Sequence, residues 1–95
     1  MLEKTVEKAL IRECKKQKWL CYKFVAPGRR SVPDRIVITD FGKVFFVELK
    51  APGKIESKNQ LREAKKLRAQ GCTVYGTIDS LQKIKELIEL ELLLR

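Results

Sequence analysis

The chain contains no histidine among its 95 residues, and this absence removes several classes of chemistry at once. Catalysis in which an imidazole activates a serine or a cysteine is excluded, because no side chain is present to act as that base. A zinc site is disfavoured as well, since the three cysteines are widely spaced and include no Cys-x-x-Cys pair. Unpaired thiols are typical of a reducing compartment, so we expect a cytoplasmic location.

Long apolar runs are also missing, and the first residues carry no signal-peptide core. We therefore expect no association with a membrane. With 44% hydrophobic and 35% charged residues, the composition is typical of a globular protein, and the length is sufficient for one hydrophobic core. These features predict a single domain over residues 1–95.

Acidic residues are few relative to basic ones. Twelve Asp and Glu stand against 21 Lys and Arg, which gives a net charge of +9, and all of the excess lies before Asp79. Strongly basic proteins often bind polyanions such as nucleic acid, but a solvated basic surface gives the same net charge. Charge alone leaves these two interpretations open.

A β-hairpin is predicted from two runs rich in Val, Ile and Phe, residues 35–39 and 43–48, which flank a three-residue loop that contains glycine. The antiparallel register of such a hairpin places Asp34 opposite Glu48, with their Cβ atoms about 4.5–5.5 Å apart. Because side chains alternate between the two faces of a strand, Lys50 lies on the same side as Glu48.

The opposed carboxylates of Asp34 and Glu48 form a candidate metal site. Two carboxylates on a mostly apolar face repel each other and lose hydration, which destabilises the fold unless something compensates. A hard divalent cation with oxygen ligands would compensate, and Lys50 beside it could then serve catalysis. The alternative is a structural Glu-Lys pair and an aspartate in a Pro-Asp turn, and a register error of one residue would separate the two carboxylates.

Three helices are predicted: Leu2 to about Lys18, Ser57 to Gln70 and Ser80 to Leu94. Strand-forming residues predict further strands at 19–25 and 72–78. The order is therefore αβββαβα, with three antiparallel strands followed by a right-handed crossover to a parallel fourth strand. We expect a three-layer α/β fold with a mixed four-stranded sheet flanked by helices.

This order and several motifs resemble the PD-(D/E)xK nuclease superfamily, which implies a restriction-endonuclease-like core. Within the superfamily, nearly the whole chain resembles the small stand-alone VRR-NUC domain that is common in bacteriophages. The matching motifs are Tyr22-Lys-Phe24, Pro27-Gly-Arg-Arg-Ser-Val-Pro-Asp34, Val47-Glu-Leu-Lys-Ala-Pro-Gly53, Asn59-Gln-Leu-Arg62 and Leu67-Arg-Ala-Gln-Gly71. Two positions depart from the family pattern, since Ser31 and Lys18-Trp19 stand where the family usually has glycine.

The resemblance implies a nuclease that depends on Mg²⁺ or Mn²⁺. The residues that it assigns to catalysis are Glu7, Asp34, Glu48, Lys50 and Gln60. The metal ligands would be Asp34, Glu48 and the backbone carbonyl of Leu49, with Glu7 of the first helix completing the acidic site, in one reading through water.

Two of these residues also have local explanations. Glu7 could pair with a neighbouring lysine on its helix. Gln60 could be the reciprocal half of a capping box with Ser57, although it shares a helix face with Ala64 and Leu67 and so could point toward the sheet.

The resemblance further implies hydrolysis of DNA phosphodiesters to 5′-phosphate and 3′-hydroxyl ends, on branched DNA such as Holliday junctions, in the host cytoplasm if the chain is phage-encoded. A homodimer is expected, and the third helix is a candidate contact because it carries more leucine and isoleucine than one helix face can hold.

The expected DNA contacts are Lys23, Arg29, Arg30, Arg35, Lys54, Lys58 and Arg62. The alternatives are a flap, nicking or poorly selective endonuclease, and a module that binds nucleic acid without cleaving it.

Overall fold

The computed structural model describes residues 2–95 and confirms the predicted order of elements. The elements are α1 (Glu3–Lys16), β1 (Leu20–Lys23), β2 (Arg35–Ile38), β3 (Val44–Leu49), α2 (Lys58–Ala69), β4 (Thr73–Ile78) and α3 (Leu81–Leu94). The first strand is shorter than predicted. Trp19 is buried ahead of it and donates a hydrogen bond from Nε1 to Asp40 (3.0 Å), and the chain leaves the sheet after Phe24, whose N–H donates to the Asp34 carbonyl.

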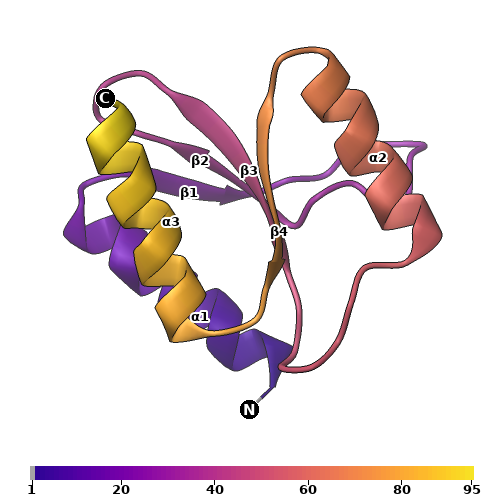
Figure 1. Cartoon of the computed structure of the whole chain (residues 1–95), viewed down its shortest axis with the longest axis horizontal. Helices are drawn as coiled ribbons and strands as arrows, with labels where there is room; N and C mark the ends of the chain where they lie inside the picture. Colours follow the sequence, from indigo (N-terminus) through magenta and orange to yellow (C-terminus); the bar gives the residue numbers. More distant parts are fainter. Residues whose placement is uncertain (1) are drawn as a thin grey trace.

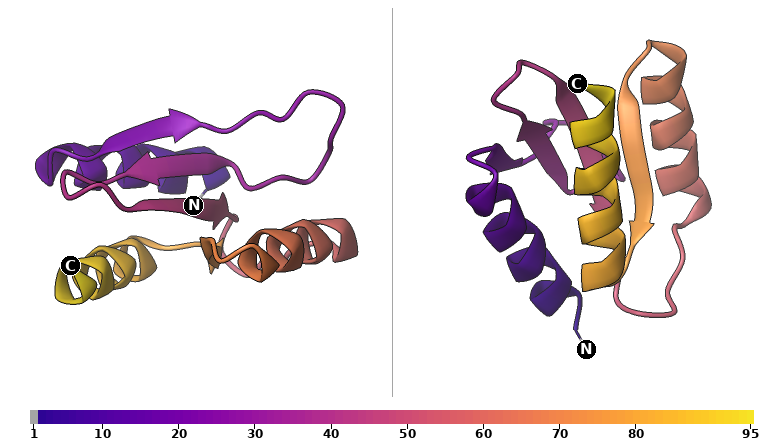
Figure 2. Two further views of the ribbon diagram at one scale, coloured as in Figure 1. Left: turned by 90° about the horizontal axis from the view of Figure 1, so that it is seen from above. Right: turned by 60° about the vertical axis from the view of Figure 1, so that its left-hand side comes forward.

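The four strands form one mixed sheet in the order β1-β2-β3-β4, and Figure 2 (left) shows them following one another in this order. The first two pairs are antiparallel and β3 pairs with β4 in parallel, as predicted. In the hairpin, Ile38 pairs with Val44 and Arg35 with Val47. The Thr39 N–H donates to the Lys43 carbonyl (2.9 Å), so the predicted hairpin register is confirmed.

Helices cover both faces of the sheet, which confirms the three-layer α/β fold. α1 and α3 lie together on one face, and α2 lies alone on the other (Figure 1). The larger core includes Leu10 of α1, Phe45 of β3 and Ile84 of α3, whereas Phe46 packs with Ala64 of α2 and Val74 in a smaller cluster. β3 is buried on both sides from Phe45 onward, which explains its nearly continuous apolar sequence.

The two departures from the family pattern fall at unusual backbone conformations. Lys18 has φ of 63° and Ser31 has φ of 66°. This left-handed region costs about 1–3 kcal/mol for a residue other than glycine, because the Cβ crowds the backbone. A glycine would relieve that crowding at both positions.

β4 contains an irregularity near its end. Tyr75 pairs with Val47 but Ile78 pairs with Leu49, so β4 has one more residue than β3 over this stretch. Within it, Thr77 has φ of 53°. These features define a β-bulge at Gly76 and Thr77, and a bulge re-aims the side chains next to it.

α3 buries one face and exposes several leucines, in line with its excess of apolar residues. Leu90, Leu93 and Leu94 are 45%, 77% and 61% exposed. Glu91 is fully buried on the face of α3 that packs against the sheet. Its Oε1 pairs with Lys43 Nζ (2.7 Å), and its Oε2 accepts a hydrogen bond from the Tyr75 hydroxyl (2.5 Å).

The structure also describes the state of the three cysteines and the lengths of the helices. Cys14, Cys21 and Cys72 are free thiols. Across residues 2–95, no helix combines the length and the apolar character needed to cross a bilayer.

Candidate active site

Asp34 and Glu48 lie at the end of the hairpin that is remote from its turn. Because Arg35 pairs with Val47, Asp34 and Glu48 are the next residues along their two strands. The Asp34 Oδ2 atom accepts a hydrogen bond from the Leu49 N–H (2.7 Å), which fixes the carboxylate against β3. Glu48 points toward α2 and is 4% exposed.

Burial and charge strongly perturb Glu48. Loss of hydration raises the pKa of its carboxyl group to about 8, and a shared hydrogen bond and repulsion with Asp34 add to this effect. Lys50 lowers the pKa and the more distant Glu56 raises it. Without a cation, the pair of Asp34 and Glu48 therefore retains a proton near neutral pH.

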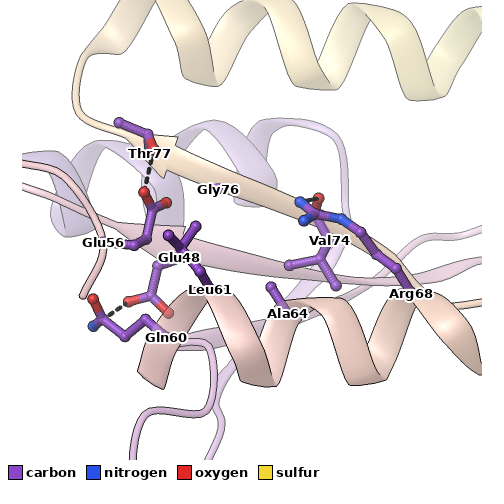
Figure 3. Close-up of a pocket in the computed structure, with 9 residues that line it drawn as sticks. All are labelled: Glu48, Glu56, Gln60, Leu61, Ala64, Arg68, Val74, Gly76 and Thr77. Carbon is purple, nitrogen blue, oxygen red and sulfur yellow. Dashed lines mark hydrogen bonds between the residues drawn. The ribbon is translucent and has the colours of Figure 1, made fainter. Parts of the chain in front are cut away.

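Gln60 connects Glu48 with Lys50. Its Oε1 accepts a hydrogen bond from Lys50 Nζ (2.7 Å) and its Nε2 donates to Glu48 Oε1 (3.2 Å), the bond drawn in Figure 3. The same Oε1 also accepts from the Ser57 N–H, while Ser57 Oγ accepts from the Gln60 N–H, so the capping box is present. Gln60 therefore completes the capping box and also points toward the sheet, where it contacts Glu48 and Lys50.

Glu7 is attached to the site indirectly. Its Oε2 accepts a hydrogen bond from Arg35 Nε (3.1 Å), and Arg35 is the residue after Asp34. Nowhere in residues 2–95 do three His, Cys, Asp or Glu side chains gather in positions that could hold one ion. The structure brings Asp34, Glu48, Lys50 and Gln60 together. Glu7 is not in contact with this group and is connected to it through its ion pair with Arg35.

The donor set at Asp34 and Glu48 fits a hard divalent cation. Carboxylate and carbonyl oxygens are the ligands that such ions prefer, and the Leu49 backbone is held beside Asp34 by its own N–H. The raised pKa of Glu48 points the same way, because a cation would replace the proton that two facing carboxylates otherwise share.

A cavity of about 210 Å³ adjoins the site under α2 (Figure 3). Its lining residues are Glu48, Glu56, Gln60, Leu61, Ala64, Arg68, Val74, Gly76 and Thr77. The sequence analysis did not assign Glu56, Arg68 or Thr77 to the site. Gly76 inside a strand was the available signal, since such a glycine often marks a bulge or a close approach.

The expected DNA contacts lie mainly on the surface, although two of them have carboxylate partners. Lys23, Arg29, Arg30, Lys54, Lys58 and Arg62 are exposed. Arg29 is paired with Glu63 (2.5 Å), which links the loop between β1 and β2 to α2. Arg35 is only partly exposed because it pairs with Glu7.

Comparison with known proteins bears on the family and the fold of the chain. No model of a protein family matches the chain. The "Putative nuclease p44" of Acyrthosiphon pisum secondary endosymbiont phage 1 is 51% identical over 72 residues, which cover 76% of this chain and 77% of that protein. A solved structure described as a VRR_NUC domain covers 92% of this chain and 94% of its own, at 31% identity and a TM-score of 0.84. The chain, with its αβββαβα fold and its paired carboxylates at the end of the hairpin, therefore belongs to the VRR-NUC family of nucleases.

Proposed function

We propose that the protein is a metal-dependent endonuclease that hydrolyses DNA phosphodiesters at Asp34, Glu48, Lys50 and Gln60. One observation carries the proposal: a buried carboxylate with its pKa raised to about 8 faces a second carboxylate, and a lysine is hydrogen-bonded through Gln60 on the same face. Two facing carboxylates without a cation lower the stability of the fold, so their presence favours a catalytic role.

Mg²⁺ or Mn²⁺, held by Asp34, Glu48 and the Leu49 carbonyl, would supply the positive charge that acidifies a water molecule and polarises a phosphate oxygen. The protein's own contribution is geometric. Asp34 is oriented by the Leu49 N–H, and Glu48 by the Gln60 amide. Both carboxylates must be ionised to bind a cation, so proton and cation compete for Glu48.

Lys50 supplies a charge of its own. Gln60 Oε1 holds its ammonium group at 2.7 Å, next to the carboxylate of Glu48. A fixed cation in this place would stabilise the negative charge that develops on the phosphate in the transition state. We propose that Glu7 completes the acidic site through water. Arg35 would orient the Glu7 carboxylate by its hydrogen bond to it.

The DNA would be bound mainly through its backbone. The exposed cations around the site belong to the end of β1, the loop between β1 and β2, the loop after β3 and the first turns of α2. Cations spread over loops and a helix surface suit phosphate contacts, which do not depend on sequence. We therefore propose selection by DNA shape, with branched DNA such as a Holliday junction as the preferred substrate and 5′-phosphate and 3′-hydroxyl products.

A homodimer would place one site on each strand of such a junction. The leucines exposed on α3 support this assembly, because Leu93 and Leu94 project from an otherwise well-packed helix. The free thiols suit the reducing cytoplasm of a host cell.

The test is a cleavage assay with matched junction, flap, duplex and single-stranded DNA, with and without Mg²⁺ or Mn²⁺. We expect cleavage only with metal, and fastest at the junction. Asp34→Asn should abolish cleavage, and Lys50→Ala should slow it about 10²- to 10³-fold while retaining most DNA binding. Lys85→Ala, an exposed lysine on α3, is the matched control.

Each outcome separates the proposals. Metal-independent cleavage or an active Asp34→Asn variant would refute the metal site. Equal rates on all substrates would indicate a poorly selective endonuclease, preference for the flap or for one strand would indicate a flap or nicking enzyme, and binding without cleavage under every condition would indicate a binding module.

A further inference from the structure

Glu56 anchors the segment that joins β3 to α2. Between Pro52 and Asn59, Glu56 is the only residue that is partly buried, and residues 51–57 form neither helix nor strand. Its Oε2 accepts a hydrogen bond from the Thr77 hydroxyl (2.5 Å), as Figure 3 shows. This contact ties an otherwise solvated segment to β4.

The bulge in β4 creates the place that receives this carboxylate. Thr77, with φ of 53°, turns its hydroxyl toward Glu56. A Cβ at Gly76 would lie 2.8 Å from Glu56 Oε1, so any other residue there would displace the carboxylate from its present position. Burial by itself raises the pKa of Glu56. Hydrogen bonds from the Thr77 hydroxyl and from the backbone of Glu56 and Thr77, together with the charge of Lys50, outweigh this effect and hold the pKa of Glu56 below its ordinary value. Glu56 is therefore a charged acceptor.

The anchor is adjacent to the contacts that hold the proposed catalytic lysine. Ser57, the next residue, caps α2 and donates its N–H to Gln60 Oε1 (2.9 Å). That same oxygen accepts from Lys50 Nζ. A shift of the segment at Glu56 would therefore displace the atom on which the ammonium group rests.

We propose that Glu56 is a positioning residue of the active site: its hydrogen bond to Thr77 fixes the start of α2 against β4, so that Gln60 holds Lys50 beside Glu48. The inference rests on the proposed nuclease function for its effect on catalysis, but the anchoring itself does not. Glu56 acts through Ser57 and Gln60 and touches no reacting atom.

The experiment compares Glu56→Ala, Glu56→Gln and Thr77→Val with the wild type and with Glu89→Ala, which removes an exposed glutamate from α3. Valine keeps the branched shape of threonine but lacks the hydroxyl donor, and glutamine keeps an oxygen acceptor. Single-turnover cleavage at saturating DNA gives the rate constant, and fluorescence anisotropy gives the affinity for DNA. Hydrogen exchange of the peptide spanning residues 54–61, measured without metal, reports the anchoring independently of cleavage.

We expect Glu56→Ala and Thr77→Val to lower the cleavage rate about 10- to 100-fold, with DNA affinity changed less than about twofold, because a small displacement near a reacting group is costly. Exchange of the 54–61 peptide should accelerate in both variants. Glu56→Gln should restore the rate to within about threefold of wild type and restore the slow exchange.

Unchanged exchange in Glu56→Ala would overturn the proposal, as would a wild-type cleavage rate in a folded Glu56→Ala protein. If the wild type itself cleaves no DNA, the proposed function fails, and the exchange measurement still decides whether Glu56 fixes the start of α2.

Discussion

A single buried carboxylate, Glu48, dominates the electrostatics of the candidate active site. Its hydration is lost on folding, and Asp34 repels its charge across the end of the hairpin. The folded state therefore binds a proton at Glu48 more tightly than the unfolded chain does, since its pKa is about 8 rather than 4.5. As the pH rises through this interval, the unfolded chain releases the proton first, and the free energy of unfolding falls.

Replacing Glu48 by glutamine should remove this pH dependence. In the absence of metal, Glu48→Gln should be more stable than the wild type at pH 8 by roughly 1–3 kcal/mol, and the two should converge toward pH 4.5. Urea denaturation at a series of pH values would measure the difference. Glu89→Gln, at an exposed position on α3, is the control and should follow the wild type. Parallel pH profiles of Glu48→Gln and wild type would contradict the raised pKa.

Two of the arginines expected to contact DNA are paired with carboxylates in the structure. Arg35 is held by Glu7, and Arg29 by Glu63 on α2. Arg30, beside Arg29, is exposed. The Arg29 pair lies at the surface, where water and salt weaken ion pairs, so a DNA phosphate could replace Glu63 as its partner.

At the scale of elements, the hairpin turn and α3 are joined by a buried charge. Glu91 occupies a position on the core-facing side of α3 and is paired there with Lys43, next to the turn. The Tyr75 hydroxyl donates to the same carboxylate, and burial together with this contact raises the pKa of Tyr75. The three side chains come from β4, from α3 and from the residue that precedes β3.

Removing Lys43 should destabilise the protein, because it leaves the buried carboxylate of Glu91 without a counter-charge. Lys43→Ala should lower the free energy of unfolding by about 2–4 kcal/mol at neutral pH, because Glu91 would lose its counter-charge while remaining inside. Urea denaturation would measure it, with Lys85→Ala on the exposed side of α3 as the matched control. If Lys43→Ala and Lys85→Ala unfold at the same urea concentration, the pair does not stabilise the protein.

For the whole molecule, the distribution of charge and apolar surface separates two regions. The basic excess lies in residues 1–78, which include the candidate active site, whereas residues 79–95 are nearly neutral and include the exposed leucines of α3. A neutral apolar surface is suited to contact with another protein, and a basic one to contact with DNA.

Dimerisation through α3 should therefore be sensitive to charge at its exposed leucines. Light scattering at micromolar concentration should give twice the 11.0 kDa mass of the chain, and Leu90→Lys with Leu93→Lys should reduce it to the monomer. Leu2→Lys, at an exposed leucine before α1, should leave the dimer intact. A wild-type mass of one chain would refute the dimer, and a dimer that persists in the double variant would place its interface elsewhere.

The sequence alone determined the order of the elements, the hairpin register and the capping of α2. These features depend on short-range patterns: runs rich in Val, Ile and Phe, a glycine in a three-residue loop, and Ser57 three positions before Gln60. The register then placed Asp34 and Glu48 together, so the centre of the candidate site could be predicted from the hairpin by itself. The bounds of β1 were less predictable, because the burial of Trp19 against Asp40 depends on the turn of a later hairpin.

Only the tertiary structure decided the contacts between residues far apart along the chain. The pairing of Glu7 with Arg35, of Glu91 with Lys43 and of Glu56 with Thr77 has no local signature, since each joins two different elements or a loop to a strand. The same holds for the raised pKa of Glu48, which depends on how completely α2 and β4 exclude water from its carboxylate. A sequence pattern fixes which face a side chain occupies, but burial and charge pairing arise only when the layers pack together.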